Sequence, residues 1–245
     1  MSERKFMLCA TILWACALGI GAAPKSPPKP LYEQRFRANI HGIGKFFMGR
    51  QISHVMGHRG ASWLERPERE REEGTTEMIN CLKLRSGDHV ADIGVGTGYI
   101  AWRMAKKVGQ RGTVYGVDIQ PEMLAHLKRN MAKRGITNVK GVQGTIKDPK
   151  LKPNSLDFVI MVDVYHEFSF PYEMMQGIVK ALKPGGRVAF VEYRGEDPKV
   201  PIKRLHKMTE AQVKKEAALF SLKHVETYKK LPWQHVIFFQ KVASK

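Results

Sequence analysis

Short hydrophobic segments alternate with amphipathic ones along most of this 245-residue chain, and the alternation predicts strands and helices that follow one another in turn. Residues 156–162 hold one polar position, Asp157, which is typical of a strand buried on both faces of a parallel sheet. Two amphipathic stretches open at Pro121 and Pro171, and proline is favoured in the first turn of a helix. Further strands are expected at residues 113–117, 139–143, 187–193, 225–231 and 235–241, and further helices begin near residues 75, 99 and 209. The pattern predicts an α/β fold.

The most informative stretch is residues 90–98, Val-Ala-Asp-Ile-Gly-Val-Gly-Thr-Gly. A buried strand here leads through Asp92 into three glycines at alternate positions, and a helical pattern follows at once. A side chain at any of these glycines would block the approach of a ligand or forbid the backbone angles of the turn. Strand, glycine-rich turn and helix together form the outline of a nucleotide-binding turn.

The spacing of the glycines indicates which nucleotide. A dinucleotide site uses G-x-G-x-x-G to seat a pyrophosphate on the helix N-terminus, whereas this turn has G-x-G-x-G and Asp92, a carboxylate that would repel phosphate and attract a cation. The D-x-G-x-G-x-G pattern resembles motif I of class I S-adenosylmethionine-dependent methyltransferases, whose cofactor carries an ammonium and a sulfonium. This resemblance implies S-adenosylmethionine as cofactor. It also implies a Rossmann-like, doubly wound sheet of seven strands, mostly parallel with an antiparallel C-terminal strand.

Later passages extend the resemblance over residues 75–241. The sequence Leu-Lys-Pro-Gly-Gly at 182–186, between a helix and an apolar strand, is similar to the same passage in the small-molecule methyltransferases related to the quinone-biosynthesis and arsenite enzymes. The resemblance implies methyl transfer to a small-molecule acceptor. Two alternatives stay open: residues 93–122 are also similar to protein carboxyl methyltransferases that act on isoaspartate, and a non-catalytic protein could keep the fold to sense the cofactor.

Candidate cofactor residues follow the strand ends. Asp118 ends the second strand, where an acidic side chain can accept hydrogen bonds from both ribose hydroxyls. Methyltransferases often carry an acidic residue for the adenine soon after the third strand, but this chain has Thr145 and Ile146 there. The expected cofactor-binding residues are Asp92, Gly94, Gly96, Gly98, Asp118, Ile119, Thr145 and Asp163.

The candidate reacting site is the polar and aromatic cluster 163–168, which follows the buried strand and should face the same crevice, because ligands lie outside the carboxyl ends of such sheets. We expect His166 to act as general base, with Tyr165 beside it, although either side chain could instead serve packing. The expected substrate-binding residues are Arg59, Trp63, Tyr193, Arg194 and His206, with Arg194 attracting an anionic group. No metal site is expected, since His54 and His58 lack a third ligand.

The segment before residue 75 divides into three parts. Residues 1–23 hold Arg4, Lys5 and an uncharged run at 6–20, which predicts a signal-like leader and export to the periplasm or medium, with a retained membrane anchor as the alternative. Residues 24–30 form a Pro/Lys-rich tether. Residues 31–74 are expected to form a helical cap interrupted by glycines, and residues 75–245 the methyltransferase domain.

The chain is strongly basic, with a formal net charge of +18 at pH 7. Such a surplus indicates an anionic partner, which could be a membrane surface, nucleic acid or an acidic substrate, and a solvated basic surface without a partner stays open as the alternative. Because the basic residues are spread along the chain without interleaved aromatic residues, nucleic acid is an unlikely partner. The sequence gives no indication of the oligomeric state.

Overall fold

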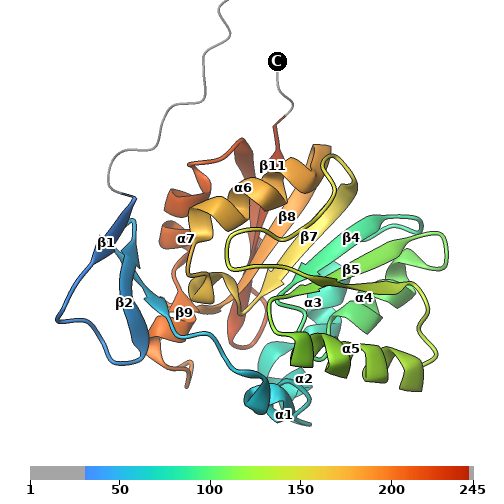
Figure 1. Cartoon of the computed structure of the whole chain (residues 1–245), viewed down its shortest axis with the longest axis horizontal. Coiled ribbons are helices and arrows are strands. Elements are labelled where there is room, and N and C mark those ends of the chain that lie inside the picture. The colour runs from blue at the N-terminus through green and yellow to red at the C-terminus, as the bar shows by residue number, and fades with distance from the viewer. Residues whose placement is uncertain (1–30, 243–245) are drawn as a thin grey trace, which may run out of the picture.

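Seven strands lie side by side in the main sheet, in the order β10-β11-β8-β7-β4-β5-β6, and a two-residue strand, β9, pairs with β8 (Figure 1). This is a computed structural model, and it describes residues 31–242. The strands are β4 (His89–Ile93), β5 (Thr113–Asp118), β6 (Val139–Gln143), β7 (Leu156–Val162), β8 (Leu182–Arg194), β9 (Lys207–Met208), β10 (Leu222–Tyr228) and β11 (Gln234–Lys241).

The pairing confirms the expected sheet. Strands β4 to β8 are parallel, whereas β11 runs antiparallel to β8 and to β10. The chain moves outward from β4 to β6 and then returns to place β7 on the other side of β4. This reversal between β4 and β7 is the topological switch point at which open α/β sheets bind their ligands.

Helices cover both faces of the sheet. Val90 and Phe158 point to a face packed by α3 (Thr75–Cys81), α4 (Ala101–Val108) and α5 (Pro121–Lys133). The neighbouring residues Ala91 and Val159 point to the opposite face, which is packed by α6 (Pro171–Ala181) and α7 (Glu210–Ala217). Burial on both faces explains why the central strands are almost wholly apolar.

The segment before α3 differs from the expected helical cap. Residues 32–53 form an antiparallel sheet of β1 (Tyr32–Gln34), β2 (Gly42–Phe47) and β3 (Arg50–Ser53), and only the following residues form η1 (His58–Gly60), α1 (Ala61–Leu64) and α2 (Arg69–Glu73). Met48 and Gly49 both have positive φ, as a two-residue hairpin turn requires. The expectation of helix over 32–53 was therefore wrong, because the glycines mark hairpin geometry there.

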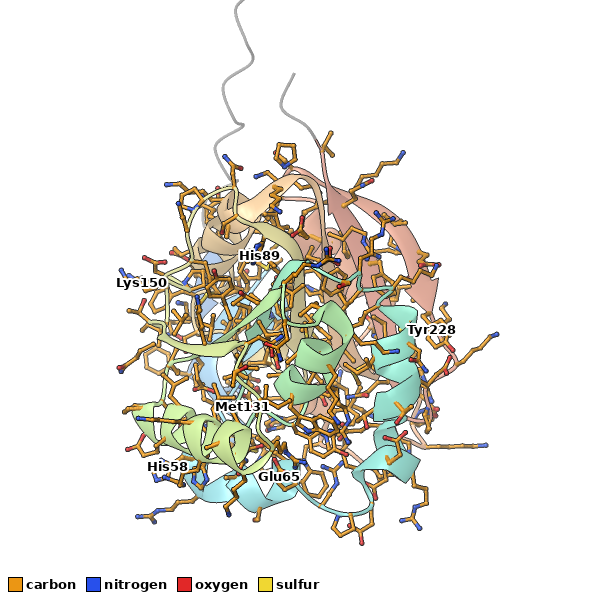
Figure 2. All side chains as sticks on the ribbon, turned by 90° about the vertical axis from the view of Figure 1, so that its right-hand side faces the viewer. His58, Glu65, His89, Met131, Lys150 and Tyr228 are labelled. Carbon is orange, nitrogen blue, oxygen red and sulfur yellow. The ribbon has the colours of Figure 1, made fainter. Side chains whose placement is uncertain are left out.

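The short helices cross the end of the domain beside α5. His58 lies 3.9 Å from Glu122 at the start of α5, and Glu65 lies 3.9 Å from Arg134 just after its end. Figure 2 shows His58 and Glu65 below α5, which carries the labelled Met131. This segment is thereby held over the carboxyl ends of the strands.

Arg50 joins the N-terminal sheet to the main domain. Its guanidinium donates to both carboxylate oxygens of Glu216 on α7, at 2.8 and 2.9 Å, and to the carbonyl of His166 at 3.1 Å. Ser53 also donates to that carbonyl, at 3.3 Å. The N-terminal sheet therefore holds the backbone at a position that the sequence assigns to the reacting site.

Within residues 31–242, the structure has no helix that is both long and apolar enough to cross a membrane. The leader and the tether lie outside the described residues.

Breaking the buried Arg50–Glu216 pair should destabilise the protein strongly. Glu216→Gln leaves the guanidinium without its counter-charge, so the free energy of unfolding should fall by about 3–5 kcal/mol. Chemical denaturation checks this against Lys214→Ala, which removes the half-exposed Lys214–Glu210 pair and should cost no more than about 0.5 kcal/mol. Equal losses in the two variants would contradict this role for Arg50.

Candidate active site

A cavity of about 540 Å³ opens at the switch point, outside the carboxyl ends of β4, β5 and β7. This volume is in the range of small-molecule sites. Its walls come from the glycine-rich turn, from the ends of β5 and β7, from the segment around α1, and from residues 201–206. Most wall residues are apolar, among them Val55, Met56, Leu64, Met123, Ile146, Phe168, Met174 and Ile202.

The glycine-rich turn approaches the cavity with backbone that other residues rarely adopt. Gly94, Gly96 and Gly98 have φ of 71°, 52° and 86°. Gly94 and Gly96 line the cavity, and a Cβ on Gly96 would lie 2.5 Å from the side chain of Leu64. Gly98 faces Leu127 on α5 instead. Gly98 therefore serves helix packing, and the other two glycines serve the approach to the ligand.

Two carboxylates flank this turn. Asp118 lines the cavity and accepts backbone hydrogen bonds from Gly96 at 3.0 Å and Gln120 at 2.9 Å, which fix its orientation. Asp92 is buried, lines a small cavity that adjoins the large one, and forms no hydrogen bond within the described residues. Burial raises the pKa of Asp92 to about 7, although Arg69 acts in the opposite direction. A cationic ligand group would relieve this burial of charge.

Asp163 lies at the end of β7 in a strained position. Its φ is 50°, and it accepts a hydrogen bond from Gln234 at 2.6 Å while its other oxygen has no partner in the described residues. Tyr193 also lines the cavity and donates to Glu73 at 2.8 Å. Burial, Glu73 and Glu192 raise the pKa of Asp163 well above its usual range.

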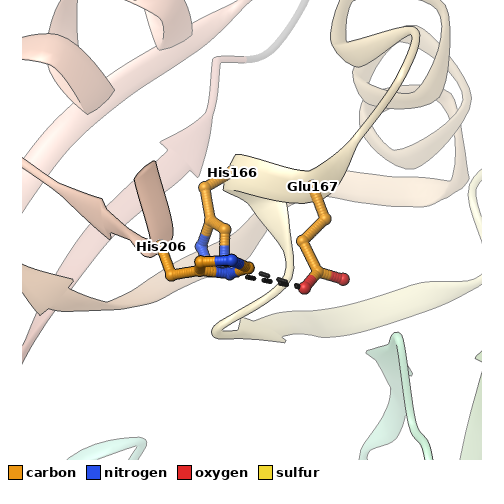
Figure 3. A group of neighbouring side chains, drawn as sticks. All are labelled: His166, Glu167 and His206. Carbon is orange, nitrogen blue, oxygen red and sulfur yellow. Dashed lines mark hydrogen bonds and ion pairs between the residues drawn. The ribbon is translucent and has the colours of Figure 1, made fainter. Parts of the chain in front are cut away.

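A second polar part of the cavity wall is centred on His166, which contacts Glu192 and His206. This side chain is 1% exposed; its Nδ1 lies 2.6 Å from Glu192 and its Nε2 lies 3.2 Å from Nδ1 of His206. Glu167 lies beside both rings (Figure 3). His166 and Glu167 belong to η2 (Tyr165–Glu167), and His206 ends η3 (Arg204–His206). His166, Glu167 and His206 all line the cavity.

Burial and the Glu192 carboxylate act in opposite directions on His166. Burial lowers the pKa of this imidazole, but Glu192 outweighs it, so the pKa is raised overall. Burial and the nearby His166 and Lys203 lower the pKa of His206 to about 4, and burial raises the pKa of Glu167 to about 7. His206 is therefore neutral near pH 7.

Several residues expected at the site lie outside the cavity. Tyr165 is wholly buried and packs edge-on against Phe168 and Phe190, because successive residues of η2 point to opposite sides. Thr145 accepts hydrogen bonds from the backbone of its own turn, and Ile146 lines the cavity in its place. These two assignments are corrected by the geometry.

Two arginines expected to bind substrate are also placed elsewhere. Arg194 donates to the carbonyls of Leu231 and Gln234, at 2.7 and 2.9 Å, so it holds the turn between β10 and β11. Arg59 is exposed and is not part of the cavity wall. The cavity wall does contain Ile119, Asp163, Trp63, Tyr193 and His206, which were expected there.

Several charged residues that were not predicted from the sequence also contribute to the site through buried hydrogen bonds. Glu73 accepts hydrogen bonds from Arg66 and Arg69 at 2.6 and 2.7 Å, and Glu192 orients His166. Arg69, Glu73 and Glu192 lie inside helices or a strand, and Arg66 lies between α1 and α2. At such positions a charged residue in the sequence is easily taken for a solvated one.

Fold and cavity together define a nucleotide-binding α/β protein of the methyltransferase type. The chain belongs to the methyltransferase-domain family, whose model, "Methyltransferase domain", matches residues 84–237. S-adenosylmethionine is the cofactor of this domain, as the glycine-rich turn implied.

Curated relatives share part of the chain. The arsenite methyltransferase of Halobacterium salinarum is 34% identical over 103 residues, which cover 42% of this chain and 26% of that protein. The ubiquinone/menaquinone biosynthesis C-methyltransferase of Idiomarina loihiensis is 30% identical over 116 residues, covering 47% of this chain and 46% of that protein. The chain thus spans less than half the length of these relatives.

Solved structures agree on the fold. A SAM-dependent methyltransferase from Aquifex aeolicus matches with a TM-score of 0.73 at 21% identity, over 77% of this chain and all of that one. A putative S-adenosylmethionine-dependent methyltransferase from Methanococcus maripaludis matches with a TM-score of 0.58 at 14% identity, over 79% of this chain and 99% of that one.

The residues present fit this cofactor. Asp118 retains oxygen lone pairs that can accept from ribose hydroxyls, and the unpartnered Asp92 carboxylate can meet the cationic amino acid end. Ile119, Met123 and Ile146 supply apolar surface for an aromatic base.

Cofactor affinity should fall below pH 7 because of Asp92. As the pH drops through the Asp92 pKa of about 7, the carboxyl gains a proton and loses its attraction for the cation. One proton taken up on release of the ligand weakens binding by roughly 10-fold per pH unit. Calorimetric titration of S-adenosylmethionine on either side of pH 7 checks this. Asp92→Asn should bind weakly with a flat pH profile, and an unchanged slope in that variant would contradict the assignment.

Proposed function

We propose that this protein transfers the methyl group of S-adenosylmethionine to a small-molecule acceptor bound in the apolar part of the cavity. The observation that carries the proposal is that one cavity joins the Gly96 and Asp118 end, beside the small cavity that holds Asp92, to a separate polar wall formed by His166, Glu167 and His206. The relatives named for arsenite and for quinones support a small acceptor.

Methyl transfer from S-adenosylmethionine requires few catalytic side chains. The cofactor supplies a methyl carbon activated by its sulfonium, so the acceptor forms a bond to that carbon as the bond to sulfur breaks. The chain contributes alignment of the acceptor and exclusion of water. Met56 and Trp63 on one side and Ile202 on another supply apolar walls that can do both.

The polar wall is the part of the cavity where an acceptor can lose a proton. His166 cannot take that proton directly while Glu192 and His206 occupy its two nitrogens, so we infer that it works through His206. An isoaspartate site in a protein would need an open groove, whereas residues 55–64 and 201–206 both contribute walls here. This favours a small acceptor over a protein.

His166→Gln should lower turnover by about 10²-fold to 10⁴-fold and leave cofactor affinity nearly unchanged, because the change removes a group from the acceptor side only. Release of S-adenosylhomocysteine over a panel of metabolites first identifies an acceptor. Turnover is then measured per folded molecule, with the exposed His41→Gln as control. If turnover per folded molecule is preserved and only the melting temperature falls, His166 is a structural residue. Cofactor binding without methylation of any panel member would favour the sensing alternative.

We further propose that the β1–β2 loop contacts an anionic membrane surface. Phe36 and Ile40 are 111% and 85% exposed, and Arg35, Arg37 and His41 stand between or beside them, which suits insertion of apolar side chains among acidic headgroups.

Sedimentation with vesicles containing phosphatidylserine tests this contact. Replacing Phe36 and Ile40 together by serine should weaken binding by roughly 100-fold or more, since each inserted side chain contributes about 1.5–3 kcal/mol. Val225→Ser, at a side chain that is 52% exposed on β10, is the control. Equal binding by both variants would overturn the proposal.

For the whole chain we propose export, supported by Arg4, Lys5 and the uncharged run at 6–20. A reporter fused behind residues 1–30 should leave the cytosol, either released or held at the membrane. A reporter that stays soluble inside the cell would contradict both forms of the proposal.

A further inference from the structure

Three donor atoms converge on one point in the polar wall. The Nε2 of His166 and the Nδ1 of His206 lie 3.2 Å apart, and the Oε1 of Glu167 lies 3.9 Å from the first and 3.8 Å from the second (Figure 3). A hydrogen bond accounts for the short contact between the rings. The carboxylate is too far from either ring for a hydrogen bond.

The size of this triangle fits a metal ion. A point equidistant from three atoms at these separations lies about 2.1 Å from each, and zinc binds imidazole nitrogen and carboxylate oxygen at about 2.0–2.2 Å. Two histidines and one glutamate are a ligand set that also suits iron and other divalent first-row metals. We propose that His166, Glu167 and His206 bind a divalent transition-metal ion.

The surroundings hold two of the three ligands, His166 and Glu167, in place. Glu192 lies 2.6 Å from the remaining nitrogen of His166 and is itself wholly buried, which reproduces the carboxylate–histidine–metal arrangement of many metal sites. Arg50 and Ser53 hold the His166 carbonyl, and the backbone N–H of Met56 donates to Glu167 at 3.2 Å. His166 and Glu167 are thus oriented by elements other than their own.

The ion would face the acceptor. Because the three ligands line the cavity, a fourth coordination position opens into it. Given the proposed methyl transfer, this selects acceptors with an acidic hydroxyl, such as a phenol or an enol. With the ion bound, His166 and His206 would hold it and would no longer relay the acceptor proton. The hydroxyl oxygen would bind the ion and release its proton to water, and that oxygen would then form the bond to the methyl carbon while the carbon–sulfur bond breaks.

Metal binding is measured without cofactor or acceptor. The intact protein, stripped with a chelator and dialysed, is titrated with Co²⁺ and Zn²⁺, and the Co²⁺ absorption spectrum is recorded. We expect one equivalent bound at the site. His206→Gln and Glu167→Gln should abolish this binding, and Glu192→Gln, which changes the partner of the His166 ring and removes no ligand, should weaken it by about 10-fold to 100-fold.

His58→Gln is the matched control, since His58 also lies 3.9 Å from a glutamate but is not one of the three convergent donors. This variant should bind the ion like the unchanged protein. Melting temperature and S-adenosylmethionine binding establish that each variant is folded. Absence of binding by the intact protein, or binding that survives His206→Gln and Glu167→Gln, would overturn the proposal.

Activity separates this proposal from the proposed function. If an acceptor is methylated equally well by the chelator-treated protein, the metal has no part in the reaction and its role there is refuted while methyl transfer stands. If one metal ion binds as expected but no acceptor is methylated, the site is supported and the proposed function fails.

Discussion

Parallel pairing of β4 with both β5 and β7 is the constraint on which the site depends. Because parallel strands end at the same edge, Asp92, Asp118 and Asp163 are brought to one crevice from positions far apart in the sequence. Burial makes this costly for carboxylates and raises the pKa of all three, while the charge of Asp118 adds to the rise at Asp92 and those of Glu73 and Glu192 add to the rise at Asp163. A cationic cofactor offsets it, so the pairing of the strands and the choice of ligand are physically linked.

The second constraint is the way in which the polar wall is assembled. His166, Glu167 and His206 come from two short 3₁₀ segments, which have little stability of their own. Buried partners supply it: Glu192 on β8 fixes the ring of His166, and Arg50 on β3 fixes its carbonyl. The N-terminal sheet is therefore part of the site, although none of its strands provides a ligand.

The sequence predicted those features that depend on local pattern. Apolar periodicity predicted the order of the strands and helices. Glycine spacing predicted the glycine-rich turn, and the end of the following strand predicted Asp118. The prediction of a helical cap was wrong over residues 32–53, where Met48 and Gly49 adopt the positive φ of a hairpin turn. Such a turn lacks the Asn-Gly or Asp-Gly signature by which hairpins are recognised.

Contacts between distant residues were not accessible to sequence reasoning. His206 was expected in the pocket, but it lies forty residues after His166 in the sequence, and no sequence pattern predicts that the two rings are in contact. Glu192 is a single polar residue in an apolar strand, so its contact with His166 was not predicted either. For Arg194 the sequence predicted a contact that the structure does not have. Its position near the end of a strand suggested that it binds an anionic substrate, but its guanidinium donates to backbone carbonyls instead. In both cases the role of the side chain depends on which hydrogen-bond donors and acceptors surround it, and these are known only from the folded structure.

Ligand titration on a pair of glycine variants tests the central claim most directly. Gly96 and Gly135 both have left-handed backbone, but a side chain at Gly96 meets Leu64 at the cavity, whereas one at Gly135 meets open space. Calorimetry should show S-adenosylmethionine binding to the unchanged protein and to Gly135→Leu, none to folded Gly96→Leu, and no tight binding of NAD to any of them. Tight binding of NAD without S-adenosylmethionine, or full cofactor affinity in Gly96→Leu, would contradict the account.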